Sequence, residues 1–300
     1  MENIFELIKA ILFGIVEGIT EWLPISSTGH MILLNEFIQL DVSEEFWDMF
    51  LVVIQLGAIL AVVVLFWNLI WPFTMRKNAT APSVSSQKGF WKQESWIIGP
   101  IAVKMGIIIN WLKIVVACLP AIVFVLLDLD DICDKLFYNA VGVSIALIVF
   151  GVAFIIVETR NAGKSAKIME MQNITWKMAI LIGLFQLLAA AFPGTSRSGA
   201  TIIGALLIGV SRKAASEFTF ILAIPVMLGA SLLELLDFGL ALSGTEWMIL
   251  LIGMVSAFIV SVFVIKFLLS YIRKHDFKVF GWYRIVLGII VLICGFVGII

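Results

Sequence analysis

Charged residues are scarce in this sequence. Of its 300 residues, 14% are Asp, Glu, Lys or Arg and 62% are hydrophobic, whereas a soluble domain carries roughly 25% charged residues. This composition excludes an ordinary soluble domain and indicates an integral membrane protein. The apolar segments are continuous runs, which also excludes a transmembrane β-barrel, because polar and apolar residues alternate in its strands.

Cysteine and histidine are scarce as well. The three cysteines, Cys118, Cys133 and Cys294, are too widely spaced to form a metal or redox motif. Glu2 and Glu6 stand among the first apolar residues, where a cleaved signal peptide would carry basic ones. We therefore expect neither a cysteine-based centre nor a cleaved leader.

Long apolar runs make up most of the chain. Six of them have the length of a membrane-spanning helix, which needs roughly 20 residues; they lie near 49–72, 101–127, 137–157, 218–236, 247–271 and 280–300. Two further stretches, 4–36 and 176–211, are apolar but interrupted in the middle by Pro, Gly, Ser and Thr. Backbone that leaves a helix inside a bilayer must bond to other protein groups or to water. Each of these two stretches therefore predicts a re-entrant pair of half-helices.

The charges of the loops predict the orientation. Basic residues gather in the loops 73–96, 158–177 and 272–279, and acidic residues gather in the connections between them. Lysine and arginine mark the cytoplasmic side of a membrane. With six spans and two re-entrant pairs, every basic loop lies inside and every acidic connection lies outside.

The two interrupted stretches resemble each other. A shift of 169 residues places four residues of the first stretch on residues of the second: Gly14 on Gly183, Glu17 on Gln186, Pro24 on Pro193 and Ser27 on Ser196. A second match pairs 45–58 with 217–230. Because the loop charges give the copies opposite orientations, we predict an inverted-topology repeat, which places a site near the midplane at the broken helices.

The predicted fold is therefore an all-α integral membrane protein forming a single domain over 1–300. The prediction divides it into five parts: a first repeat core in 1–72, a cytoplasmic loop in 73–100, two spans in 101–157, a second repeat core in 176–236 and two C-terminal spans in 247–300.

Two acids and a histidine lie in the first interrupted stretch. Glu17 and Glu21 are four residues apart, so a helix places both on one face about 6 Å apart. Two carboxylates in apolar surroundings must share a proton, bind a cation or meet a positive group; the alternative is an interfacial helix with solvated acids. His30 follows the cluster Ser26, Ser27 and Thr28, whose hydroxyls either bind an anion or cap the next helix.

Arg197 is the strongest candidate in the second stretch. Its guanidinium cannot lose its charge, and its forked donors match a phosphate or carboxylate. A helix that starts nearby adds its positive end. We predict an anion site, with phosphate as the favoured ligand and hydroxyls from Ser196, Ser198 and Thr201. The alternative is a structural salt bridge from Arg197 to Glu17 or Glu21.

These motifs closely resemble those of the undecaprenyl-diphosphatase family, which is linked to bacitracin resistance. The resemblance rests on the runs 17–30 and 193–201 and extends through 53–61 and 209–218. It implies removal of the terminal phosphate from a polyprenyl diphosphate in the bacterial cytoplasmic membrane, which releases the monophosphate carrier lipid used in cell-wall synthesis. It assigns the acidic motif to Glu17 and Glu21, and it implies membrane lipid but no nucleic acid as a partner.

Our hypothesis is phosphoryl transfer with Arg197 stabilising charge, Ser27 as nucleophile and His30 as base or acid. A phosphohistidine at His30 and direct attack by water remain alternatives. Glu17 and Glu21 would hold a divalent cation, magnesium or calcium, or orient the histidine. The rival functions are a secondary transporter, which also uses inverted repeats, and a lipid flippase. The sequence does not decide between a monomer and a homodimer.

Overall fold

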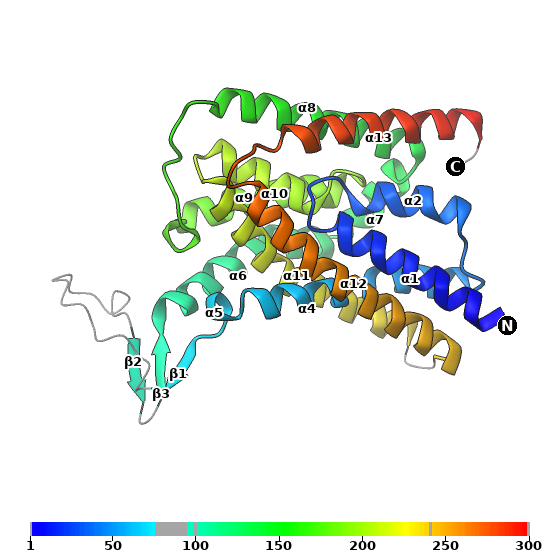
Figure 1. Cartoon of the computed structure of the whole chain (residues 1–300), viewed down its shortest axis with the longest axis horizontal. Helices are drawn as coiled ribbons and strands as arrows, with labels where there is room; N and C mark the ends of the chain where they lie inside the picture. The colour runs from blue at the N-terminus through cyan, green and yellow to red at the C-terminus, as the bar shows by residue number, and fades with distance from the viewer. Residues whose placement is uncertain (1, 76–94, 99–100, 240–241, 299–300) are drawn as a thin grey trace.

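The computed structural model describes residues 2–75, 95–98, 101–239 and 242–298. Within these residues, six helical segments are long and apolar enough to cross a membrane, as predicted. They are α3 (Glu44–Val53) continued by α4 (Gln55–Leu65), α6 (Met105–Leu126), α8 (Ala140–Asn161), α11 (Arg212–Phe238), α12 (Gly244–Tyr271) and α13 (Lys278–Val297). The chain is an all-α integral membrane protein with six long apolar helices (Figure 1).

The two interrupted stretches form pairs of shorter helices that break where the sequence predicts. The first pair is α1 (Glu2–Thr20) and α2 (Ser27–Phe37), and the second is α9 (Trp176–Ala191) and α10 (Arg197–Leu207). Serine caps explain the new helix starts: Ser26 Oγ accepts from the Gly29 amide and Ser196 Oγ accepts from the Gly199 amide.

In each pair, the start of the first helix lies next to the end of the second helix. In the first pair, Lys9 Nζ donates to Gln39 O at 2.7 Å and the Asp41 amide donates to Glu6 at 2.8 Å. In the second, the Lys167 amide, which precedes α9, donates to Gly209 O, just after α10, at 2.8 Å. Both pairs are therefore hairpins; their re-entry into the bilayer stays a prediction.

The two hairpins open at opposite ends of α12. Its first residues line a small cavity together with Glu6 and Asp41, whereas Ile272, directly after its last turn, lines a second cavity with Gly209. A helix of 28 residues is about 42 Å long, so the openings lie far apart. This arrangement matches the predicted opposite orientation of the repeats.

Helix packing is also repeated between the two halves of the chain. α1 packs on α12 and α9 packs on α6, while α8 lies beside α13 (Figure 1). Gly151 of α8 and Gly281 of α13 meet reciprocally: a Cβ on either would lie 2.7 Å from the carbonyl oxygen of the other. Only glycine permits this approach, and the reciprocal contact lets α8 and α13 pack closely against each other.

The structure differs from the prediction around the first cytoplasmic loop. A three-stranded antiparallel sheet joins β1 (Phe73–Met75), β3 (Ile101–Lys104) and β2 (Ser95–Ile98), in that order. The span predicted from residue 101 therefore starts at Met105. The rest of the predicted loop, 76–94 and 99–100, lies outside the described residues.

The other helix boundaries shift by a few residues. The first predicted span, 49–72, starts earlier because Ser43 caps α3, and it ends at Leu65 before the short α5 (Trp67–Ile70). The acidic connection near 128–134 contains a further helix that the sequence did not predict, α7 (Leu129–Phe137).

The buried core lies beside the two helix breaks. Trp22 of the first break is fully buried and packs edge-on against Phe220 of α11, with ring centroids 5.2 Å apart. Ile25 of the same break and Ile202 of α10 belong to the same cluster of buried side chains. Burial of these large apolar groups from both halves fixes the breaks against each other.

Candidate active site

Glu21 joins the two breaks. One carboxylate oxygen accepts from Ser27 Oγ at 3.0 Å, and the other accepts from an Arg197 guanidinium nitrogen at 2.8 Å. The backbone oxygen of Glu21 accepts from Ser198 Oγ at 3.0 Å. The first turn of α2 and the first turn of α10 therefore meet on one residue, which is only 7% exposed. The structure contains the Arg197–Glu21 salt bridge that the sequence left as an alternative, and the serine lies on the same carboxylate.

Both breaks contain a serine with strained backbone. Ser26 has a φ of 74° and Ser196 has a φ of 69°, and both cap the helix that follows. Positive φ is uncommon for a residue with a Cβ, and such strain gathers at functional sites because the surrounding fold must maintain it. The same strained conformation at the N-cap serine of both breaks indicates that the two breaks share one local structure.

This correspondence corrects the repeat register. The sequence paired Ser27 with Ser196, but the caps pair Ser26 with Ser196 and hence Ser27 with Arg197. The physical reason is a difference in length. Counted from the matched glycines Gly14 and Gly183, α9 extends two residues further than α1. The break that follows α9 is one residue shorter than the break that follows α1. The nucleophile candidate and the arginine thus occupy equivalent positions.

The predicted hydroxyls divide into two groups. Ser27, Thr28 and Ser196 are partly exposed, as is Arg197, so these side chains can reach a ligand. The others are buried: Ser26, Ser198 and Thr201. Thr201 lies behind the arginine, where its hydroxyl donates to Arg197 O at 2.9 Å and contacts Thr219 Oγ1 at 2.9 Å. Its described contacts support the start of α10.

His30 points toward α13. Its Nδ1 lies 2.6 Å from Ser26 O, and its Nε2 lies 2.7 Å from the Tyr283 hydroxyl. A carbonyl oxygen can only accept, so Nδ1 carries the proton and, in the neutral ring, Nε2 accepts from the tyrosine. The hydroxyl of Ser27 is bonded to Glu21 instead. The structure therefore gives the serine a carboxylate neighbour in place of the predicted histidine.

Glu17 and its counterpart Gln186 lie in the interior. Glu17 is 1% exposed and Gln186 is 3% exposed. Within the described part of the chain, Glu17 Oε1 and both polar atoms of the Gln186 amide have no hydrogen-bond partner. Buried polar atoms without partners are rare and call for an explanation such as a bound ion or water.

The sequence matches known proteins over nearly its whole length. The family model for bacitracin resistance protein BacA matches residues 10–290. Proteins named undecaprenyl-diphosphatase are similar throughout: one from Desulfitobacterium hafniense is 57% identical, covering 96% of this chain and 95% of that protein. One from Enterococcus faecalis is 53% identical, covering 97% and 98%. Undecaprenyl-diphosphatase 1 of Clostridium acetobutylicum is 56% identical, covering 98% of each chain. The chain belongs to the BacA family.

Arg284 is the residue of this BacA-family site that the sequence analysis missed. It is fully buried in α13, and its guanidinium donates to Pro24 O at 3.3 Å, Gly194 O at 2.9 Å and Leu147 O at 3.4 Å. Pro24 and Gly194 are equivalent positions in the corrected register. One side chain therefore ties the two breaks together from behind. The available signal was its place as the one charged residue in the run 280–300, because a charge inside a span indicates function by default.

The carboxylates of this BacA-family chain fit a magnesium-type site. Among the described residues, no three His, Cys, Asp or Glu side chains cluster. Mg²⁺ needs only one or two carboxylates when waters and substrate phosphates complete its shell. Glu17 has an unpartnered buried oxygen, and it lies one helical turn before Glu21, whose amide donates to Glu17 O at 3.0 Å. Glu17 has a free oxygen for such a shell, and Glu21 would add one if a substrate phosphate took its place on Arg197.

Proposed function

We propose that this protein hydrolyses undecaprenyl diphosphate to undecaprenyl phosphate and inorganic phosphate. The reaction recycles the lipid carrier of cell-wall synthesis and thereby gives resistance to bacitracin. The protein is a multi-pass protein of the bacterial inner membrane. The observation that carries the proposal is the meeting of Ser27 and Arg197 on Glu21, in a chain whose relatives are named for this activity. The candidate nucleophile, the candidate base and a phosphate-binding group would thus lie together.

Arg197 would bind the terminal phosphate. Its forked guanidinium can bond two phosphate oxygens, and its only carboxylate partner among the described residues is Glu21. A phosphate of higher charge can replace this carboxylate. The exchange would free the Glu21 oxygen that bonds Arg197, while the other oxygen stays on Ser27 Oγ. The partly exposed hydroxyls of Thr28 and Ser196 add donors.

Ser27 would attack the terminal phosphorus. Glu21 accepts the proton of the serine hydroxyl as the Oγ–P bond forms and the anhydride P–O bond breaks, and the polyprenyl phosphate leaves with that proton. Water then attacks the phosphoserine and gives a proton to Glu21, which passes it to Ser27 Oγ as inorganic phosphate leaves. The supporting contact is the 3.0 Å bond from Ser27 to Glu21. His30 and Tyr283 would position α2 through Ser26.

A divalent cation, magnesium or calcium, is part of the proposal. Glu17 and Glu21 would hold it, and when bound it would neutralise charge on the diphosphate. The unpartnered oxygen of Glu17 supports this assignment.

The test is phosphate release by the purified protein in detergent micelles with a polyprenyl diphosphate. A transporter or flippase releases no phosphate where no vesicle exists, so activity separates these functions from the proposed one. We expect Arg197→Ala to lower kcat/KM at least about a thousandfold. The control is Arg273→Ala, which removes an exposed arginine outside the candidate site and should leave the rate unchanged. Near-normal release by Arg197→Ala would refute the proposal, and a chelator arm measures the cation requirement.

A further inference from the structure

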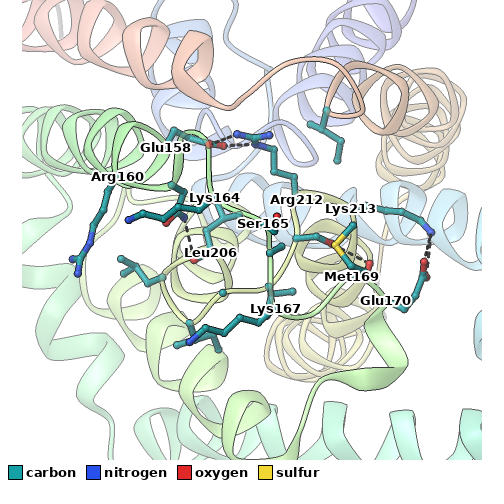
Figure 2. Close-up of a pocket in the computed structure, with 18 residues that line it drawn as sticks. Glu158, Arg160, Lys164, Ser165, Lys167, Met169, Glu170, Leu206, Arg212 and Lys213 are labelled. Carbon is teal, nitrogen blue, oxygen red and sulfur yellow. Dashed lines mark hydrogen bonds and ion pairs between the residues drawn. The ribbon is translucent and has the colours of Figure 1, made fainter.

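A basic cavity lies where α8 and α10 end and α11 begins. Its volume is about 750 Å³, and Figure 2 shows its lining, which includes Glu158, Lys164, Lys167, Glu170, Arg212 and Lys213. Arg197 stands at the other end of α10, and a helix of 11 residues is about 16 Å long. The cavity is therefore separate from the candidate active site.

The charges of the cavity leave a positive excess. Arg212 bonds the buried Glu158 through two nitrogens, at 2.8 and 2.5 Å, and Lys213 bonds Glu170 at 3.2 Å. These two pairs lie at the top and right of Figure 2. The remaining cations of the lining are Arg160, Lys164 and Lys167, which form no salt bridge with any carboxylate of the described chain. Three positive charges thus remain for an external anion.

The lysine segment is fixed in place. The amides of Lys167 and Ile168 donate to Gly209 O at 2.8 and 3.2 Å, and the Ser211 amide donates to Ile168 O at 2.8 Å. Gly209 has a φ of 89°, and a Cβ there would lie 3.3 Å from the Lys167 side chain, so the lysine stem rests on the open face of the glycine. Because the backbone at Lys167 is already held, only its side chain loses freedom when an anion binds.

Exposed apolar side chains adjoin the positive charges. Met169 is 60% exposed and Leu207 is 44% exposed, and both line the cavity. The loop charges place this end of the molecule at the cytoplasmic leaflet, where anionic lipids gather. Inorganic phosphate gains nothing from apolar contacts, whereas a phospholipid does.

We propose that this cavity binds the phosphate headgroup of an anionic phospholipid of the cytoplasmic leaflet, with the acyl chains passing along Leu207 and Met169. Lys164 and Lys167 provide the charge that selects an anionic over a zwitterionic lipid. This site is independent of the proposed hydrolysis and does not require it.

The experiment is native mass spectrometry of the full-length protein after delipidation, with phosphatidylglycerol or phosphatidylcholine added in increasing amounts. We expect tighter retention of phosphatidylglycerol, and about 30-fold weaker retention in the double variant Lys164→Gln/Lys167→Gln, because each basic residue contributes about fivefold. The matched control is Arg273→Gln/Lys274→Gln, which removes the same charge outside the cavity lining and should retain the lipid almost as the parent does.

Three results would overturn the assignment. Equal loss in both double variants would mean a diffuse surface potential rather than a site. Equal retention of the two lipids by the parent would exclude anion selection. Inorganic phosphate that displaces the lipid at equal concentration would identify a free-anion site, because the apolar contacts would then contribute nothing. Phosphate release from the micellar substrate by both variants serves as the folding check.

Discussion

Glu21 contacts both members of the proposed reaction pair through different oxygens. One oxygen accepts from Ser27 and the other from Arg197, so a ligand that takes the arginine changes the carboxylate next to the serine. A phosphate that binds Arg197 would therefore also change the surroundings of the proposed proton acceptor, because both contacts are made by this one side chain.

The relative losses at Ser27 and His30 test the assigned roles. Ser27→Ala should lower kcat at least about a thousandfold, because the nucleophile is lost. His30→Asn should lower it less than about a hundredfold, since an amide donor can still reach Ser26 O. The measurement is phosphate release at saturating substrate. The reverse order of losses would assign the covalent step to the histidine, and nearly full activity in Ser27→Ala would assign the attack to water.

At the scale of elements, the two broken helices depend on a third, α13. Arg284 supplies donors to a carbonyl in each break and to one in α8. A fully buried cation is costly in a membrane, and its retention here is explained by the carbonyl groups that would otherwise lack partners inside the protein. The guanidinium sets the separation of the two breaks, and therefore the distance between Ser27 and Arg197.

Replacement of Arg284 should separate activity from stability. We expect Arg284→Met to lower phosphate release about a hundredfold, because a shift of about 1 Å at a reacting centre has that effect, with partial recovery in Arg284→Lys. The matched control is Lys113→Met, since Lys113 is also buried and donates to a carbonyl, that of Gln172, away from the breaks. Both variants should melt earlier by circular dichroism, but only Arg284→Met should lose activity. Equal loss in both would reduce Arg284 to a general stabilising role.

The sequence predicted the elements that have local signals. Pro24 and the serines that follow it predicted the first break, and continuous apolar runs predicted the six long helices. Contacts between distant residues had no such signal: Arg284 bonds Pro24 across 260 residues, and the register of the repeats depended on where α9 ends in three dimensions. The central strand β3 reads as apolar sequence continuous with α6, so periodicity could not separate them.

At the scale of the whole molecule, the two hairpins should have opposite orientations in the membrane. We would replace Cys118, Cys133 and Cys294 and then introduce single cysteines. An impermeant maleimide should label Asp41→Cys from the outside, and Ser165→Cys and Lys213→Cys from the cytoplasmic side. The last two sites precede and follow the second hairpin, so labelling from one side shows that it re-enters, whereas labelling from opposite sides would show that it crosses.

The reciprocal contact of Gly151 with Gly281 has a consequence for the site. A Cβ on Gly151 would also lie 3.2 Å from the Cβ of Arg284, which stands three residues after Gly281 in α13. A side chain at Gly151 would therefore push α13 away from α8, and the guanidinium that bonds both breaks would move with it. A missing side chain in α8 is in this way a requirement for the arrangement of groups around Glu21, although α8 contributes none of them.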